Sequence, residues 1–167
     1  PKGTFGNVAL TAKWSYGQLT ATFYADGNEI GTTHYTLLDS KLSNIPAVPH
    51  KDGYDGVWEP YELGANNISI NAIYTPKTYT IVYVDEKNAT NDNVTSFTIE
   101  SDTITLKDLS YPGYAFDGWY DQNNNKVTSI PKGTFGNVAL TAKWSYAQLT
   151  ATFYADGKEA GTTHFTL

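Results

Sequence analysis

The side chains best suited to chemistry in this sequence are its carboxylates and histidines. Six glutamates and eleven aspartates could in principle supply the pair of acids that hydrolyses a glycosidic bond. The histidines are His34, His50 and His164, and neither an HExxH motif nor a cysteine accompanies them. A zinc site is therefore not indicated. We expect no enzyme, no catalytic residue, no metal site and no cofactor.

Two loops rich in oxygen ligands are candidates for binding calcium. They are residues 85–93, DEKNATNDN, and residues 121–125, DQNNN. Neither has the D-x-[DN]-x-[DN]-G spacing of an EF-hand loop, so solvated turns are the favoured interpretation. A covalent Lys–Asn isopeptide cross-link needs a buried lysine, asparagine and acid in contact, and the sequence leaves that option open.

Aromatic side chains offer a different kind of chemistry, because exposed rings hold sugars by stacking. Trp58 lies between Tyr54 and Tyr61 in the segment GYDGVWEPYE. These three residues are the predicted ligand platform if the protein binds a glycan. The remaining tryptophans lie on segments of alternating apolar residues and are predicted to fill cores; they are Trp14, Trp119 and Trp144.

Composition excludes several classes of partner. The net charge is −6 and every basic residue is a lysine, so the bidentate arginine contacts that phosphates and base edges favour are absent. Nucleic acid is not an expected partner. No stretch approaches the roughly 20 apolar residues of a membrane helix, so membrane insertion is not expected either. The absence of cysteine and methionine excludes disulfides and suits an exposed extracellular setting.

A long internal repeat governs the organisation of the chain. Residues 1–37 return as residues 131–167, 130 positions later, with differences at only four positions. Such near-identity is typical of a tandem array after recent duplication, and catalytic domains seldom occur in this form. Solenoid units have about 20 to 50 residues, so a period of this length is predicted to contain more than one small domain.

A weaker similarity inside the period divides it further. The segment GYDGVW at residues 53–58 and the segment GYAFDGWY at residues 113–120 are each followed by an alternating strand that ends in an aromatic residue. We therefore predict a unit A at residues 17–77 and a unit B at residues 78–146. Residues 1–16 are then the end of a preceding unit B, and residues 147–167 the beginning of a following unit A.

The apolar residues alternate with a period of two, which predicts strands. Leu19, Ala21 and Phe23 show the pattern most clearly, and similar runs begin at residues 79 and 138. Short helices are expected only at residues 37–42 and 105–109. The predicted fold class is mainly β, or α+β at most, with small domains whose crossovers are helical or irregular.

Unit B resembles a known family of repeats. Its segment GYAFDGWYDQNNNKV and its closing VALTAKW are similar to the Listeria/Bacteroides repeat, the B-repeat module of internalin B type. Unit A, with GYDGVWEP and ISINAIYTP, looks like a companion module, although it lacks the Phe before Asp-Gly and ends in Tyr74 instead of AKW. The resemblance implies small β-grasp-like domains in an elongated tandem array on a Gram-positive surface protein, attached to the cell wall through other regions.

Two functions remain open for such an array. One is a stalk or spacer that projects an adhesive or functional region, with acidity keeping neighbouring chains apart. The other is a multivalent adhesin repeat in which many weak glycan- or protein-binding sites act by avidity. The expected partners are neighbouring repeats of the same chain, strand-paired or in a fibre, and host or cell-wall glycans or proteins. Because the flanking segments carry apolar strand faces without the rest of their domains, they are predicted to pair with something.

Overall fold

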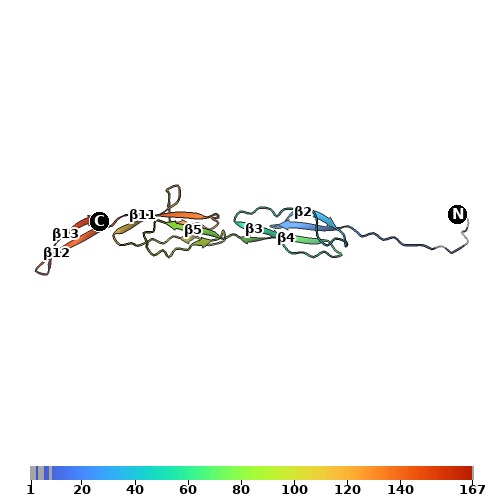
Figure 1. The fold of residues 1–167 in the computed structure, drawn as a ribbon, viewed down its shortest axis with the longest axis horizontal. Helices are drawn as coiled ribbons and strands as arrows, with labels where there is room; N and C mark the ends of the chain where they lie inside the picture. Colours follow the sequence, from blue (N-terminus) through green and yellow to red (C-terminus); the bar gives the residue numbers. More distant parts are fainter. Residues whose placement is uncertain (1–2, 4–5, 8, 167) are drawn as a thin grey trace. The chain divides into compact units, whose positions relative to one another are not determined.

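The computed structural model describes residue 3, residues 6–7 and residues 9–166, and this part of the chain forms strands and no helix (Figure 1). The mainly β class predicted from the period-two pattern is confirmed. Contacts divide the chain into two compact units. The first comprises the residues up to His50 together with Gly56–Tyr74, and the second comprises Lys51–Asp55 together with the residues from Thr75 onward.

The first unit begins with a hairpin of two antiparallel strands, β1 (Leu19–Ala25) and β2 (Asn28–Tyr35). Asp26 and Gly27 join them with φ angles of 48° and 81°. Two successive positive φ angles match the right-handed twist of a tight hairpin, which explains the Asp-Gly pair at this point. The register shifts between Phe23 and Tyr24, so a bulge interrupts the ladder there.

Two later strands complete this sheet. They are β3 (Tyr54–Trp58) and β4 (Ile68–Pro76), and the strand order is β2-β1-β4-β3. β4 runs parallel to β1, and Phe23 pairs with Ile70. One face of the sheet is apolar and buried as the alternation predicts, because every second residue of a strand lies on the same face. The buried cluster consists of Ala21, Phe23, Tyr35, Leu42 and Ile70.

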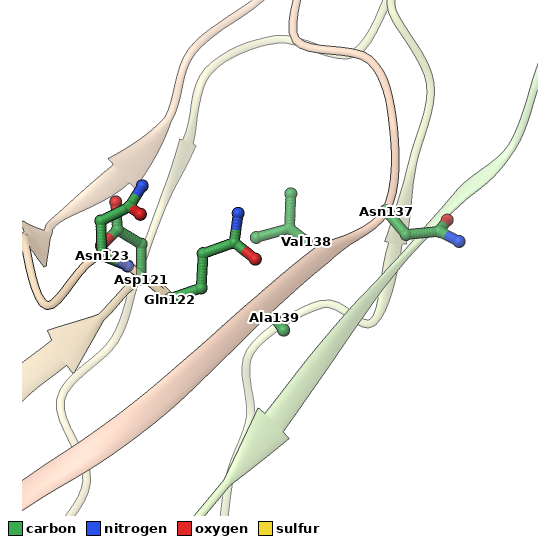
Figure 2. A pocket seen from close by; sticks show the side chains of 6 residues that line it. All are labelled: Asp121, Gln122, Asn123, Asn137, Val138 and Ala139. Atoms are coloured by element: carbon green, nitrogen blue, oxygen red, sulfur yellow. Dashed lines mark hydrogen bonds between the residues drawn. The ribbon is translucent and has the colours of Figure 1, made fainter.

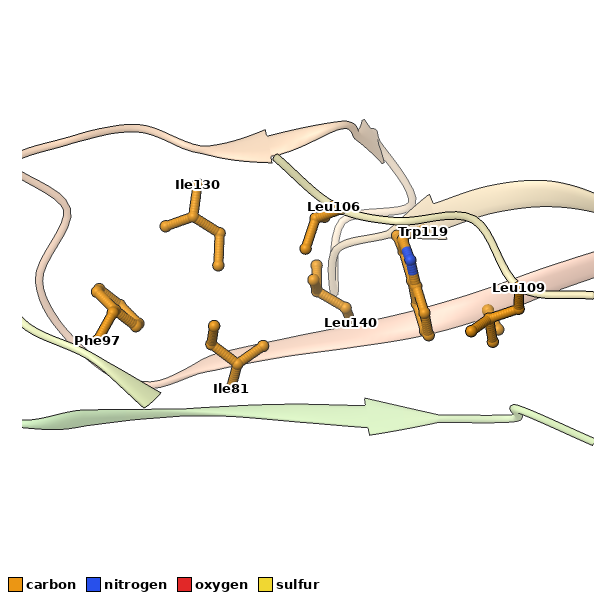
Figure 3. Packing of buried hydrophobic residues seen from close by; sticks show 8 residues of the cluster. Ile81, Phe97, Leu106, Leu109, Trp119, Ile130 and Leu140 are labelled. Carbon is orange, nitrogen blue, oxygen red and sulfur yellow. The ribbon is translucent and has the colours of Figure 1, made fainter. Parts of the chain in front are cut away.

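The second unit contains a five-stranded sheet of order β6-β5-β11-β8-β9. Its strands are β5 (Tyr79–Val84), β6 (Ser96–Phe97), β8 (Tyr114–Tyr120), β9 (Lys126–Val127) and β11 (Val138–Tyr146). A separate two-stranded sheet pairs β7 (Ile104–Thr105) with β10 (Ser129–Ile130). The side chains of both sheets meet in one core (Figure 3), which consists of Ile81, Phe97, Leu106, Leu109, Trp119, Ile130, Leu140 and Ala142.

The two units share a structural plan. In each, the first strand pairs antiparallel with the second and parallel with a strand far along the chain: β1 with β4, and β5 with β11. An asparagine just before the parallel strand accepts a hydrogen bond from the first strand in both cases. Asn67 Oδ1 accepts from Thr20 N at 2.8 Å, and Asn137 Oδ1 accepts from Thr80 N at 3.0 Å.

The C-terminal copy of the first hairpin forms a sheet of its own. Strands β12 (Gln148–Ala155) and β13 (Lys158–Thr166) pair with each other in a two-stranded sheet. The register and its bulge match those of β1 and β2. Burial differs sharply, because Phe23 is fully buried whereas its copy Phe153 is 57% exposed.

The N-terminal copy of β11 shows a similar contrast. Leu140 on β11 is 1% exposed, whereas its copy Leu10 is 91% exposed. Trp14 is 92% exposed, so the prediction that it fills a core is wrong for this structure. Of the predicted flanking segments, residues 1–2, 4–5, 8 and 167 lie outside the described residues.

Both predicted helices are absent from the structure. Residues 37–42 contain turns and bends, in which Asp39 N donates to Thr36 O at 3.1 Å. Residues 105–109 are irregular after a short strand, because the side chain of Asn93 forms hydrogen bonds with both the backbone N–H and the backbone carbonyl of Lys107. An α-helix through Lys107 would need these two groups for the backbone hydrogen bonds of the helix itself. The crossovers of both units are therefore irregular.

Candidate functional site

Trp58, the centre of the predicted platform, packs against the core of the first unit. Its ring meets the ring of Phe23 edge-on, with centroids 5.0 Å apart and an interplanar angle of 61°. Its indole Nε1 donates to Pro46 O at 2.8 Å. Trp58 as a whole is half-buried.

Trp58 and Tyr61 pack against one buried cluster of the first unit, whereas Tyr54, at the start of β3, is assigned to the second unit. Tyr61 is partly buried and packs against the same cluster as Trp58. Tyr54 belongs to the second unit, where its hydroxyl donates to Glu100 Oε1 at 2.9 Å and Lys51 Nζ lies 5.2 Å from its ring centroid. Trp58 and Tyr61 of the predicted platform therefore pack against one core. Tyr54 instead takes part in a polar contact of the second unit.

The second unit carries a larger aromatic group that the sequence analysis did not single out. It consists of Tyr111, Tyr114, Phe116, Trp144 and Tyr146, and is called the aromatic cluster below. Tyr114 and Tyr146 stack with centroids 5.3 Å apart, and Phe116 meets Trp144 edge-on at 5.1 Å. Lys87 Nζ lies 4.3 Å from the centroid of Tyr114, and Tyr146 is 59% exposed.

The aromatic cluster forms because two short segments rich in aromatic residues lie on paired strands. β8 pairs antiparallel with β11, which sets Trp144 opposite Phe116 and Tyr146 opposite Tyr114. Aromatic pairs across antiparallel strands stabilise a sheet, because their side chains lie on one face and within contact distance. The alternating aromatics of YAF and WSY would have indicated the cluster once the two strands were paired.

One hollow of the described surface is lined by both polar and apolar side chains. It has a volume of about 240 Å³ and is lined by Asp121, Gln122, Asn123, Asn137, Val138 and Ala139. Figure 2 shows the three loop residues on one side of this hollow, Asn137 on the other, and the start of β11 between them. Carboxamide and carboxylate groups of this kind can bind hydroxyl-rich molecules by hydrogen bonds.

The carboxylate of Asp121 is engaged within its own loop. Asp121 Oδ1 accepts from Asn125 N at 2.8 Å and from Asn123 N at 2.9 Å, and Oδ2 accepts from Asn125 Nδ2 at 3.1 Å. The hydrogen bonds from the backbone and side chain of Asn125 are the main cause that lowers the pKa of Asp121 below its ordinary value. The loop at residues 121–125, a calcium candidate for which a solvated turn is favoured, thus uses the carboxylate of Asp121 to hold its turn.

The other candidate loop, residues 85–93, is also hydrogen-bonded internally. Asn91 Nδ2 donates to Glu86 Oε1 at 2.5 Å. Asn93 is buried; its Oδ1 accepts from Lys107 N at 2.6 Å, and its Nδ2 donates to Lys107 O at 3.0 Å. Asn93 is therefore a structural residue that joins this loop to the crossover. Its burial could not be identified from an Asn-rich sequence.

The copied histidines make the same contact in both hairpins. His34 Nδ1 lies 3.3 Å from Thr20 Oγ1, and His164 Nδ1 lies 2.9 Å from Thr150 Oγ1. Each pair joins directly opposed residues of its hairpin. Among the described residues, no three or more His, Asp or Glu side chains gather in a group that could hold a metal ion.

One lysine contacts an asparagine, as an isopeptide cross-link would require. Lys143 Nζ donates to Asn124 Oδ1 at an exposed position. Lys143 Nζ also lies 4.1 Å from the ring centroid of Tyr120. The pair is exposed to water, whereas amide formation between these groups needs a dry site that keeps the amine neutral.

No family model matches the chain, and no solved structure is significantly similar to it. The described residues also form no helix with the length and apolar character of a membrane span.

Proposed function

We propose that this chain is part of a tandem repeat region of an extracellular bacterial surface protein, and that its units are spacers that hold another region away from the cell wall. In this proposal the units are non-catalytic β-grasp-like modules of the Listeria/Bacteroides repeat type. Neighbouring repeats of the same chain are their principal partners.

The observation that carries this proposal is the repetition of one structural plan in both units within a duplicated sequence. Each unit has a hairpin, a distant parallel strand and an asparagine that bonds the first strand. The sheet order β2-β1-β4-β3, with its parallel central pair, supports a β-grasp-like assignment in which an irregular crossover replaces the helix. Repetition of a module adds length without any requirement for a new site.

The use of the tryptophans also supports a structural role. Trp58, Trp119 and Trp144 each donate their indole N–H to a backbone carbonyl, at 2.8, 2.9 and 2.8 Å respectively. Buried or half-buried indoles that are satisfied in this way fix loops against sheets. They are not free to rotate toward a ligand.

Small-angle X-ray scattering of proteins with one, two and three 130-residue periods tests the spacer directly. A 65-residue domain has a diameter of about 28 Å, so each period should add roughly 55 Å to the maximum dimension. A maximum dimension that grows only as the cube root of the mass would contradict the proposal.

The alternative function, a multivalent adhesin repeat, is favoured by one observation, the partly exposed aromatic cluster. Tyr146 is 59% exposed and stacks on Tyr114, which is the geometry of a shallow sugar-binding surface. Binding of a three-period protein to a glycan array, compared with its Tyr146→Ala and Trp58→Ala variants, tests this alternative. Loss of binding in either variant with unchanged thermal unfolding would establish it in place of the spacer.

A further inference from the structure

The hollow beside the start of β11 lies where two strands of the second unit separate. β8 pairs with β11 as far as Tyr120, opposite Thr141, and the chain then leaves the sheet in the turn at residues 121–125. β11 itself begins at Val138, where β5 pairs with it on the other side. Among the described strands, none therefore lies opposite the edge of β11 that faces this turn at residues 138–140.

The register identifies which backbone groups face this open edge. Thr80 N–H is directed toward β11, whereas Ile81 N–H is directed to the other side, where it donates to Thr95 O at 2.8 Å. Backbone groups alternate along a strand, so those of Val82 are also directed toward β11. In a parallel ladder they bond the two residues that flank the residue opposite, which is Ala139. Ala139 itself therefore directs its N–H and C=O into the hollow that it lines.

The turn on the other side of the hollow presents groups that both donate and accept hydrogen bonds. Gln122 and Asn123 line the hollow, and their carboxamides have no hydrogen-bond partner among the described residues. Gln122 extends toward Val138 (Figure 2), whose partly buried side chain adds an apolar surface. Both carboxylate oxygens of Asp121 already accept hydrogen bonds within the turn. The hollow thus combines neutral donors and acceptors with an apolar surface.

We propose that this hollow binds one neutral pyranose ring of a glycan through Gln122, Asn123 and the backbone of Ala139. Sugar hydroxyls donate and accept hydrogen bonds as carboxamides do, and the C–H face of the ring matches the apolar surface of Val138. The volume of about 240 Å³ is below the roughly 300–1,000 Å³ of pockets for drug-sized molecules, so it is sufficient for about one ring. This site differs from the aromatic cluster, and it does not depend on the spacer function.

Other classes of ligand fit the hollow less well. An added peptide strand takes its affinity from a row of main-chain hydrogen bonds. β8 occupies the edge of β11 from Thr141 onward, so only a short stretch before Thr141 is open to such a strand. An anion is disfavoured because Asp121 is the only charged residue that lines the hollow.

NMR titration of the nitrogen-15-labelled 167-residue chain tests the site. The probes are the methyl glycosides of glucose, galactose, mannose and N-acetylglucosamine. At least one of them should cause saturable shifts of the Ala139 amide and of the side-chain amides of Gln122 and Asn123. The dissociation constant should be on the order of 1–10 mM, because the contact is small. The absence of saturable shifts at these signals with all of the probes would overturn the proposal.

A substitution in the turn tests whether the carboxamide binds the sugar. Gln122→Ala should weaken binding of that glycoside about fivefold or more, as the loss of one hydrogen bond does. The matched control is Gln18→Ala, which removes an exposed carboxamide of the first unit and should leave the dissociation constant unchanged. Both glutamines are exposed, so neither substitution should alter thermal unfolding. Equal binding by Gln122→Ala and the unmodified chain would overturn the proposal.

Two other results of the titration would also overturn it. Saturable shifts centred on Tyr114 and Tyr146 in place of Ala139 would assign the glycan to the aromatic cluster. A blocked Thr-Val-Thr tripeptide that shifts the Ala139 signal at lower concentration than every glycoside would assign the hollow to strand addition.

Amide hydrogen exchange provides an independent measurement of the geometry. In the free protein the Ala139 amide should exchange faster than the amides of Val138 and Leu140, which face β5. Saturation with the bound glycoside should slow the exchange of Ala139. An Ala139 amide that is as protected as its neighbours in the free protein, or unaffected by the glycoside, would contradict the proposed contact.

Discussion

Asn137 accepts a hydrogen bond from the backbone N–H of Thr80 at 3.0 Å, and Asn67 makes the same bond to Thr20 at 2.8 Å. Each bond joins the start of one strand to the residue before its parallel neighbour. We expect Asn137→Ala to destabilise the second unit by about 1 kcal/mol, the usual net contribution of one hydrogen bond. The corresponding decrease in melting temperature is roughly 4–8 °C for a unit of this size. Asn7, the exposed copy of Asn137, provides the control, and Asn7→Ala should leave the melting temperature of a dilute sample unchanged.

Trp144 and Trp14 have identical local sequences and opposite surroundings. Trp144 packs against Phe116 at 5.1 Å and donates to Asp85 O at 2.8 Å, whereas Trp14 is 92% exposed. Trp144→Ala should therefore cost about 3 kcal/mol or more, as truncation of a packed tryptophan does. Trp14→Ala should change stability by less than about 0.5 kcal/mol. Chemical denaturation monitored by near-ultraviolet circular dichroism measures both values, and equal effects would be inconsistent with the structure.

Gly53 lies so close to Ile99 that there is no room for a Cβ atom at this position. A Cβ added at Gly53 would lie 2.7 Å from Cδ1 of Ile99, and the φ angle of Gly53 is 79°. Gly53→Ala should therefore lower the melting temperature through both backbone strain and overlap. Gly27 has nearly the same φ angle, 81°, but an added Cβ would have nothing within 4 Å. Differential scanning calorimetry should show a larger decrease for Gly53→Ala than for Gly27→Ala, and the reverse order would refute the close contact.

The carboxyl group of Asp121 should titrate at low pH. Hydrogen bonds from Asn125 and Asn123 lower its pKa in the folded protein relative to the unfolded chain. A depressed native pKa means that the stabilisation from this carboxylate is present above about pH 4, the unfolded value, and is lost as the pH falls through the native pKa. Carbon-13 NMR of the carboxyl group should give a pKa below that of an unstructured aspartate. Asn125→Ala should raise it, and an unchanged value in that variant would exclude the side chain of Asn125 as a cause.

The strands could be predicted from the sequence because their alternation reflects burial on one face. Phe23 and Leu140 are buried as the period-two pattern requires. The two expected helices failed because side chains compete for the backbone groups that a helix needs. Asp39 Oδ2 accepts from Thr36 N at 2.7 Å, and Asn93 binds both backbone groups of Lys107. Such contacts depend on residues brought together by the fold, and Asn93 is 14 positions from Lys107 in the sequence.

The candidate binding residues could be predicted only in part, for a related reason. Trp58 and Tyr61 are near in sequence and pack around one core. Tyr54 is also near to Trp58 in sequence, yet its hydroxyl donates to Glu100, 46 positions away. The aromatic cluster combines residues of β8 and β11, whose antiparallel pairing the alternation alone does not specify. Sequence spacing therefore predicts a face within one strand but does not predict which strands meet.

Forced extension of a three-period protein by atomic force microscopy tests most directly the claim that the chain is a spacer built from independent modules. Each module of about 65 residues should unfold separately and release roughly 200 Å of chain, given about 3.6 Å per extended residue less the folded length. The account predicts a sawtooth trace with two evenly spaced peaks for each period. A single peak for each period, or extension without resolved peaks, would contradict it.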